Sequence, residues 1–310
     1  MTLRAQSSQF IGCDRPFDEA DVVLFGAPYD STTSFRPGTR FGPAAMRAES
    51  FGIETYSMGT GLDLADDAAV FDSGDLELPF GDQAAALGLI EARAEEIAAA
   101  GKVPFLLGGE HLVTLGAVRA LARRHPGLRI LHFDAHADLR TDYLGNRLSH
   151  ACVMRRCHEL LGDGRIYQFG IRSGTRDERR FMLDGRVTTE LFTDETLPSV
   201  VDAMGDAPVY LTIDLDVLDP AEFPGTGTPE AGGFSYARLE RAMRLVCGRL
   251  NVVGADNVEL CPGLDSSGRS TALACKFLRE ELLALCARKA RRQAAIDNPT
   301  REGKVTWPRE

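Results

Sequence analysis

The sequence predicts an α/β protein that is built on a parallel β-sheet. Short apolar runs alternate along the chain with longer amphipathic segments, which is the pattern of strands joined by helices. The apolar runs are nearly continuous, as expected for strands that helices cover on both faces. With 310 residues, of which 44% are hydrophobic, the chain is long enough for one large core or two smaller ones.

The alternation can be followed segment by segment. The first apolar run is "DVVLFGA", and the later runs turn polar where they end. The segment at 111–125 carries leucine or valine at every third position from Leu112 to Leu121, which predicts a helix with one apolar stripe. In chain order, we expect strands at 21–27, 102–109, 128–135, 165–171, 208–217 and 251–260, and helices at 82–101, 111–125, 235–250 and 270–292.

The alternation continues without a linker or an internal repeat, which indicates a single domain over residues 1–290. The last stretch, 291–310, differs in character. It is polar, shows no periodicity and is interrupted by Pro299 and Pro308. We therefore expect a polar C-terminal tail that is mobile or packs on a neighbouring subunit.

The composition excludes several classes of partner. The formal net charge of −10 argues against nucleic acid, because phosphate binding requires clustered Lys and Arg. The seven cysteines are odd in number and form no CxxC pair, so we expect free thiols in a reducing compartment. The N-terminus lacks the apolar core of a signal peptide, and no apolar run approaches the roughly 20 residues that span a bilayer. These features predict a cytoplasmic protein with no membrane partner.

The segment "HFDAHADL" directly follows the apolar run "LRIL". In open parallel sheets, ligands bind beyond the carboxyl ends of the strands, so chemistry is expected at this position. Asp134, His136 and Asp138 alternate here, and they project to one side if the extended backbone continues through them. Carboxylates and imidazole suit a divalent metal, although the same pattern also occurs in ordinary surface turns.

Two further strand ends carry ligands of the same kind. "YLTIDLDVLDP" ends an apolar strand in Asp214 and Asp216. "LLGGEHLVTLG" presents His111 after a glycine pair, although His111 alone also fits a histidine at a helix start. The combined set exceeds what one metal with an open position needs, and it suits two ions about 3.5–4 Å apart. Oxygen-rich ligation without thiolate favours Mn²⁺ over Zn²⁺. The candidate metal ligands are His111, Asp134, His136, Asp138, Asp214 and Asp216.

Characteristic blocks of sequence occur in order through the whole domain. They are "GAPYDSTTSFRPGTRFGPAAMR" (26–47), "GGEH", "DAHAD", "SHA" (149–151), "DLDVLDP", "PGTGTPEAGG" (224–233) and "NVEL" (257–260). In this order they resemble the signature motifs of the ureohydrolase family, which includes arginases and agmatinases. A single block has little specificity, whereas the ordered set is highly specific. The resemblance implies the family's three-layer α/β/α sandwich around an eight-stranded parallel sheet.

The resemblance also implies a role for each candidate residue. Asp134 and Asp214 would bridge two Mn²⁺ ions in each subunit, and the hydroxide between the ions would attack the guanidinium carbon. Asp138 would hold the hydrogen of this hydroxide. His150 would be a proton donor or shuttle, and Glu259 would bind the guanidinium by paired hydrogen bonds. One ion would be held by His111, Asp134, Asp138 and Asp214, and the other by Asp134, His136, Asp214 and Asp216.

Some of these residues also have a plainer interpretation. His150 fits a histidine at a helix start, and Glu259 fits a strand-end carboxylate that faces solvent. The other histidines match no block, so we expect structural roles for His125, His132 and His158. The glycine-rich block "PGTGTPEAGG" lacks the GKS or GKT ending of a phosphate loop, and we interpret it as the wall of the active-site cleft.

The choice of substrate rests on differences from arginases. Arg140 stands where arginases carry a small amide, and Ser173 and Gly174 stand where they carry acidic groups, which disfavours arginine. "DAHADLR" and "SHACVMRR" are more similar to agmatinases, so the expected reaction converts agmatine and water to putrescine and urea. The alternative is a carboxylated guanidino compound such as 4-guanidinobutanoate, for which Arg140 or Arg147 supplies a cation. For the ammonium of agmatine, the sequence suggests only Asp142 as a partner.

Classes other than a ureohydrolase agree less well with the sequence. The related arginase-like deacetylases use one Zn²⁺ and a tandem histidine pair, and the chain has no "HH". A non-catalytic metal-binding regulatory protein would be expected to lose ligands, whereas all six candidates are present. We therefore expect a cytoplasmic enzyme that supplies putrescine and, as the family commonly does, forms a homo-oligomer, either a trimer or a hexamer.

Overall fold

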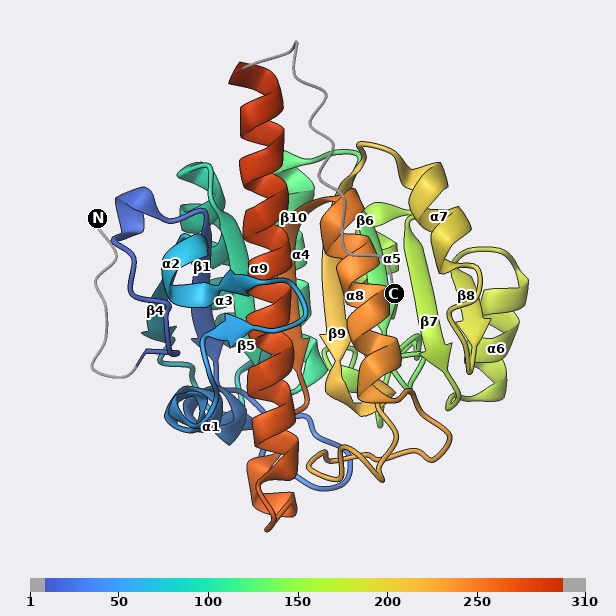
Figure 1. The fold of residues 1–310 in the computed structure, drawn as a ribbon. Helices are drawn as coiled ribbons and strands as arrows, with labels where there is room; N and C mark the ends of the chain where they lie inside the picture. Colours follow the sequence, from blue (N-terminus) through green and yellow to red (C-terminus); the bar gives the residue numbers. More distant parts are fainter. Residues whose placement is uncertain (1–8, 298–310) are drawn as a thin grey trace.

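The fold centres on an eight-stranded sheet in which all neighbouring strands are parallel (Figure 1). It is seen in a computed structural model that describes residues 9–297. The strand order is β4-β1-β5-β10-β9-β6-β7-β8, so the last strand of the chain lies in the middle of the sheet. The strands are β1 (Val22–Ala27), β4 (Val70–Asp75), β5 (Val103–Gly108), β6 (Arg129–Phe133), β7 (Ile166–Ile171), β8 (Thr188–Leu191), β9 (Pro208–Asp214) and β10 (Asn251–Val258).

Helices cover both faces of the sheet, and Figure 1 shows α8 and α9 crossing its front. Because side chains alternate along each strand, the strands feed two separate cores. In β5, Phe105 and Leu107 join the core under α8 and α9, whereas Leu106 joins the core under α3 and α4. This arrangement confirms the expected three-layer α/β/α sandwich. The helices are α1 (Gly42–Glu49), α2 (Leu64–Asp67), α3 (Gln83–Ala99), α4 (Thr114–Arg124), α5 (Val153–Leu161), α6 (Arg176–Leu183), α7 (Leu197–Met204), α8 (Tyr236–Arg249) and α9 (Arg269–Asp297).

Every strand and helix expected from the sequence is present, but the structure contains more. Strand β4 is not predicted because it reads "VFDSGD", and its Asp72 is buried with the guanidinium of Arg47 at 2.8 and 3.0 Å. Strand β8 is a half-exposed edge strand with little apolar pattern. Short helices such as α5, α6 and α7 and the small hairpin of β2 (Tyr56–Ser57) and β3 (Leu62–Asp63) are also additions.

The C-terminal region differs from the expected boundary at residue 290. Helix α9 continues to Asp297, so the first seven residues of the expected tail belong to the helix. Residues 298–310, with both of the tail's prolines, lie outside the described residues. Within the described part of the chain, every helix is too short or too polar to cross a bilayer.

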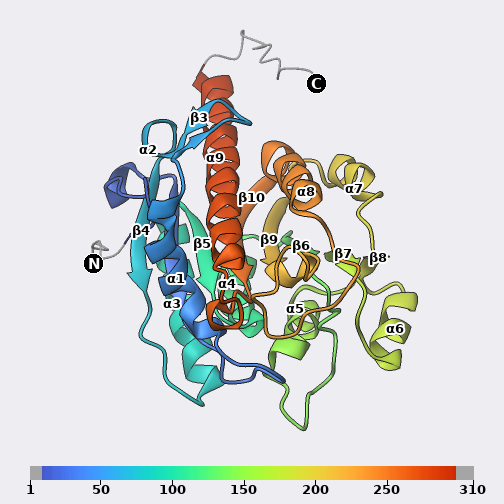
Figure 2. The ribbon, with the colours of Figure 1, turned by 60° about the horizontal axis from the view of Figure 1, so that its bottom comes forward.

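Strands β5, β10, β9 and β6 are neighbours in the middle of the sheet, and their carboxyl ends therefore meet at one edge. The loop between β9 and α8 crosses this edge at the bottom of Figure 1, and Figure 2 brings the same side forward. Side chains that follow these four strands can consequently gather at a single site.

Candidate active site

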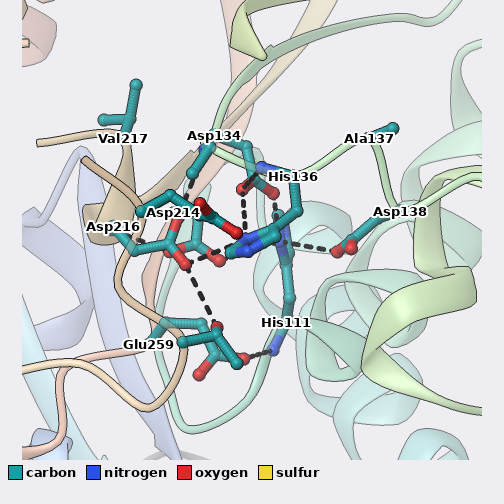
Figure 3. Close-up of polar contacts among 12 residues, drawn as sticks. His111, Asp134, His136, Ala137, Asp138, Asp214, Asp216, Val217 and Glu259 are labelled. Atoms are coloured by element: carbon teal, nitrogen blue, oxygen red, sulfur yellow. Dashed lines mark hydrogen bonds and ion pairs between the residues drawn. The ribbon is translucent and has the colours of Figure 1, made fainter. Parts of the chain in front are cut away.

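The carboxyl ends of β5, β6, β9 and β10 bring the expected site residues together. Gly108 ends β5, and a 3₁₀ turn then begins at His111. Asp134 follows β6, and Asp214 ends β9. Glu259 follows β10 in a left-handed backbone conformation with φ 66°. Figure 3 shows the side chains of His111, Asp134, His136, Asp138, Asp214, Asp216 and Glu259 turned toward one another.

The imidazole of His111 lies at the centre of the first group of candidate ligands. Its Nδ1 atom is 3.1 Å from Asp134 Oδ2, 3.3 Å from Asp138 Oδ2 and 3.2 Å from Asp214 Oδ2. The side chain is fully buried, yet among the described residues Nδ1 makes no hydrogen bond. A buried nitrogen facing three carboxylate oxygens is the arrangement that a bound cation would satisfy.

The opposite nitrogen of His111 is held by a buried hydroxyl. The Thr212 hydroxyl donates to Asp256 Oδ1 at 2.6 Å, so its oxygen accepts a hydrogen bond from His111 Nε2 at 3.0 Å. Asp256 also accepts hydrogen bonds from Tyr210 and Thr114. With the proton on Nε2, the lone pair of Nδ1 is free to bind a metal.

A second group of donors lies beside the first. His136 Nδ1 is 3.1 Å from Asp216 Oδ2 and 3.4 Å from Asp134 Oδ1. The donor atoms of Asp134, His136 and Asp216 all lie within 4.8 Å of one another, close enough to hold one ion. Asp134 therefore faces both groups, one with each carboxylate oxygen. The donor atoms of His111, His132 and Asp134 likewise lie within 4.8 Å of one another.

The cluster concentrates acidic groups in a buried space. Burial raises the pKa of Asp138 to about 7, with a further contribution from Asp134. Burial and the neighbouring Asp216 likewise raise the pKa of Asp214 well above its ordinary value. Burial opposes protonation of His111, but the surrounding carboxylates, Asp134 first, raise its pKa well above the ordinary value. The cluster thus favours positive charge at its centre, which divalent cations would supply.

The loop after β6 does not continue as a strand. The condition for the three alternating residues to project to one side, an extended backbone through all of them, is not met, because β6 ends at Phe133. Asp138 adopts a left-handed conformation with φ 53°. The loop bends so that Asp138 approaches His111, while His136 approaches Asp216. The ligands are brought together by this turn, whose geometry the alternation in the sequence does not predict.

His150 and Glu259 lie against the cluster. His150 begins a 3₁₀ turn, and its Nε2 accepts the N–H of Ser34 at 3.2 Å. Its Nδ1 is 3.8 Å from Glu259 Oε1, and that oxygen also accepts the N–H of His111 at 2.8 Å. Burial lowers the pKa of His150 to about 4, with help from His136 and His111, so the imidazole is neutral near pH 7. Burial and then Asp216 raise the pKa of Glu259 well above its ordinary value.

A pocket of about 450 Å³ lies beside the cluster. His136, Asp138 and His150 line it. Arg140, Ser173 and Gly174, the positions that differ from arginases, line it as well, together with Ser34, Arg36, Tyr143, Glu178 and Glu230.

Three of the residues suggested for substrate binding, Arg147, Asp142 and Glu259, are not among the residues that line this pocket. Arg147 is exposed and pairs with Glu159 at 2.9 Å. Asp142 accepts the N–H of Gly145 in a turn. In contrast, Glu230 was not singled out by sequence reasoning, although it lies in the block interpreted as the cleft wall. Its signal was its acidic character within an otherwise uncharged glycine-rich segment.

His132 is a second residue whose place the sequence did not indicate. Its Nε2 lies 2.7 Å from Asp134 Oδ2. The other two histidines with expected structural roles lie elsewhere: His158 pairs with Asp163, and His125 caps the end of α4.

The structure is an α/β sandwich with an all-parallel sheet. Imidazoles and carboxylates gather at the ends of its central strands, in an arrangement that can hold a metal ion. The chain belongs to the arginase family, since the model of that family, described as "Arginase family", matches residues 20–284. The resemblance of the sequence motifs to ureohydrolases, and to agmatinases in particular, is confirmed by the comparisons.

Similar proteins carry related functions. The agmatinase of Bacillus subtilis is 44% identical over 276 residues, which cover 88% of this chain and 95% of that protein. The guanidinobutyrase of Pseudomonas aeruginosa is 34% identical over 279 residues, which cover 86% of this chain and 87% of that protein. The crystal structure of a putative agmatinase from Clostridium difficile superposes with a TM-score of 0.86 at 42% identity, covering 88% of this chain and 99% of that one.

Proposed function

We propose that the chain is a binuclear-metal hydrolase that converts agmatine and water to putrescine and urea. The observation that carries the proposal is the buried Nδ1 of His111, which faces three carboxylates without a hydrogen bond among the described residues. The similarity to agmatinases over most of the chain supports the choice of agmatine.

The residues of the cluster fit two divalent cations, and hard oxygen donors favour Mn²⁺. A metal pair of this kind lowers the pKa of bound water and so makes hydroxide available near neutral pH. Asp134 and Asp214 would be shared between the ions. We propose His111, Asp134, Asp138 and Asp214 as ligands of one ion, and Asp134, His136, Asp214 and Asp216 as ligands of the other.

Residues of the chain would bind the guanidinium and transfer a proton to the departing amine. Glu259 offers a carboxylate at the edge of the cluster, and paired oxygens match the planar N–H groups of a guanidinium. Asp138 lines the pocket beside the cluster, where its carboxylate can hold the hydrogen of the attacking group. His150 is neutral near pH 7 and lines the same pocket, so it can receive a proton and pass it to the departing amine.

Two glutamates that line the pocket, Glu178 and Glu230, are candidates for binding the terminal ammonium of the substrate. Glu178 is already occupied by Thr175 and the N–H of Leu139. The carboxylate of Glu230 forms neither a hydrogen bond nor an ion pair with any other described residue. A free carboxylate lining the pocket suits the terminal ammonium of agmatine, and we propose Glu230 for this contact in place of Asp142.

A carboxylated guanidino substrate is the second candidate, because two arginines line the same pocket. Arg36 donates to the carbonyls of Thr226 and Gly227, and Arg140 lies over the ring of Tyr143. Proteins named guanidinobutyrase and guanidino acid hydrolase are 34% and 38% identical to this chain. A non-catalytic metal-binding role is less consistent, because the ligands remain together with His150 and Glu259.

Urea release by the Mn²⁺-loaded protein tests the proposal. The substrates compared are agmatine, arginine, 4-guanidinobutanoate and 3-guanidinopropanoate. Dominant turnover of agmatine is expected. Preference for a carboxylated compound would overturn the choice of agmatine and point to Arg36 and Arg140, and absence of urea from all four would overturn the ureohydrolase proposal.

The cellular setting follows from this reaction. We propose that the enzyme acts in the cytoplasm, where its product putrescine enters polyamine synthesis. We further propose a homo-oligomer, a trimer or a hexamer, which light scattering of the purified full-length chain would test.

A further inference from the structure

A buried chain of hydrogen bonds runs from the sheet to the carboxylate that both ligand groups share. The Thr189 hydroxyl on β8 donates to Gln168 Oε1 at 3.0 Å. Gln168 Nε2 on β7 lies 2.8 Å from the carbonyl of Ala137 and 3.0 Å from His132 Nδ1. His132 Nε2 in turn lies 2.7 Å from Asp134 Oδ2. Gln168, His132 and Asp134 are all fully buried.

The direction of every hydrogen bond in this chain is determined by its ends. The carbonyl of Ala137 can only accept, so the nitrogen of the Gln168 amide must face it. The Thr189 hydroxyl is compatible with this orientation, because a hydroxyl can donate to the amide oxygen. Gln168 therefore donates to His132 Nδ1 as well, and this nitrogen must carry a lone pair. The proton of the His132 imidazole is then on Nε2, which donates it to Asp134.

This tautomer separates His132 from the metal ligands. The donor atoms of His111, His132 and Asp134 are close enough to surround one cation. However, both nitrogens of His132 are used: Nδ1 accepts from Gln168, and Nε2 donates to Asp134. His132 thus has no lone pair free for a metal.

We propose that Gln168 and His132 are positioning residues that orient Asp134 for the metal pair. The inference rests on the proposed metal site. It adds which residues fix the orientation of the Asp134 carboxylate. Asp134 Oδ2 is held by His132, and Asp134 Oδ1 is held at 2.6 Å by the N–H of His136. Each oxygen keeps a further lone pair for a cation, while the carboxylate cannot rotate.

Gln168 also forms a hydrogen bond with the loop after β6, which carries the proposed ligands His136 and Asp138. Its second hydrogen bond goes to Ala137, which lies between His136 and Asp138. Removing the amide would therefore release both the tautomer of His132 and the turn that presents Asp138. Partners of this kind, one contact behind the ligands, typically contribute about 10- to 100-fold to metal affinity.

A double-mutant cycle on Mn²⁺ affinity tests whether Gln168 acts through His132. The full-length variants are Gln168→Met, which keeps the side-chain length, His132→Phe, and the double variant. By titration calorimetry, each single variant is expected to bind Mn²⁺ about 10- to 100-fold more weakly. The double variant is expected to bind no more weakly than the weaker single variant. Fully additive losses, or wild-type affinity in both single variants, would overturn the proposal.

Two further variants guard against effects of folding. His125→Phe removes a histidine at the end of α4, away from the pocket, and is expected to leave Mn²⁺ affinity unchanged. Thr189→Val removes only the hydroxyl that holds Gln168 and is expected to weaken Mn²⁺ binding about two- to tenfold. If His132→Phe does not fold, the affinity of Thr189→Val decides: wild-type affinity would then overturn the proposal.

The tautomer can be measured directly because the chain has six histidines. Nitrogen-15 spectra of the full-length, histidine-labelled, metal-free protein are expected to show His132 with its proton on Nε2 alone. A proton on Nδ1, or on both nitrogens, would overturn the inference. Both measurements omit substrate, so they are independent of whether agmatine is the compound hydrolysed.

Discussion

At the scale of single residues, the two aspartates proposed to bridge the metal ions, Asp134 and Asp214, are expected to decide whether the cluster binds metal. Asp134→Asn and Asp214→Asn each replace a carboxylate that contacts His111 Nδ1 within 3.2 Å by a neutral amide. We expect each variant to lose Mn²⁺ and activity together, because an amide neither balances the charge nor bridges two cations well. Metal content by atomic spectroscopy and urea release would be measured on the same samples. Full activity with both ions bound in either variant would refute the proposed bridging.

Glu259 should separate metal binding from turnover. Its carboxylate accepts the N–H of His111 at 2.8 Å but belongs to neither group of metal ligands. Glu259→Gln keeps the shape and loses the charge that would pair with a guanidinium. We expect two bound Mn²⁺ and a kcat/KM that is lower by about 10- to 100-fold, the value of hydrogen bonds between charged groups. A variant that loses the metal instead would make Glu259 part of the metal site.

Glu230 should affect substrate binding rather than the reaction itself. If its free carboxylate meets the ammonium of agmatine, Glu230→Gln should raise KM for agmatine about tenfold and change kcat little. The matched control is Asp142→Asn, because Asp142 lies outside the pocket and accepts the N–H of Gly145. Steady-state kinetics of the two variants distinguish the carboxylates. Equal KM values for Glu230→Gln and the unchanged protein would exclude the contact.

At the scale of elements, the side chain of Arg172 forms hydrogen bonds with both the loops around the pocket and the end of the sheet. Arg172, which follows β7, donates to the carbonyls of Asp216 at 2.7 Å and Glu230 at 2.9 Å. It also donates to the carbonyls of Val217, Leu218 and Gly170. One guanidinium thus joins the end of β7, the turn after β9 and the loop before α8.

Loss of this guanidinium should loosen all three segments at once. Because several carbonyls would lose a charged donor, Arg172→Met should lower the free energy of unfolding by about 3 kcal/mol or more. Arg179→Met on the exposed side of α6 is the control and should change stability by less than about 0.5 kcal/mol. Urea denaturation followed by circular dichroism measures both. Equal midpoints for the two variants would show that the carbonyls find other partners.

The elements also show how far the sequence alone could lead. Strands β5, β6, β9 and β10 were predictable because their apolar runs are nearly continuous, and their polar ends marked the site. Strand β4 was not predictable, because it contains the buried Asp72. The charge of Asp72 is paired with Arg47 of α1, a contact that the sequence does not reveal. The turn that places Asp138 at φ 53° depends on tertiary contacts. Likewise, the tautomer of His132 depends on a hydrogen bond from Gln168. The pairing of β6 with β7 places Gln168 beside His132, and the sequence alone does not predict this register.

At the scale of the whole molecule, the site lies where the two halves of the sheet join. The ligands follow β5 on one side of β10, and β9 and β6 on the other. The cluster places carboxylates in a buried space, and their burial, together with their mutual repulsion, opposes folding, as the raised pKa values of Asp214 and Asp138 indicate. Cations bound here would remove this repulsion and link loops from both halves of the fold.

Metal binding should therefore stabilise the entire chain and not the loops alone. At 100 times the dissociation constant, a ligand that binds only the folded state adds about 2.7 kcal/mol per site to the free energy of unfolding. For a domain of this size, one such site corresponds to a rise in Tm of about 5 °C. Thermal unfolding with added Mn²⁺, and again after excess chelator, measures the change, and the chelator should reverse it. Asp134→Asn should show little rise, since it lacks the shared carboxylate; an equal rise in this variant would place the stabilising metal elsewhere in the molecule.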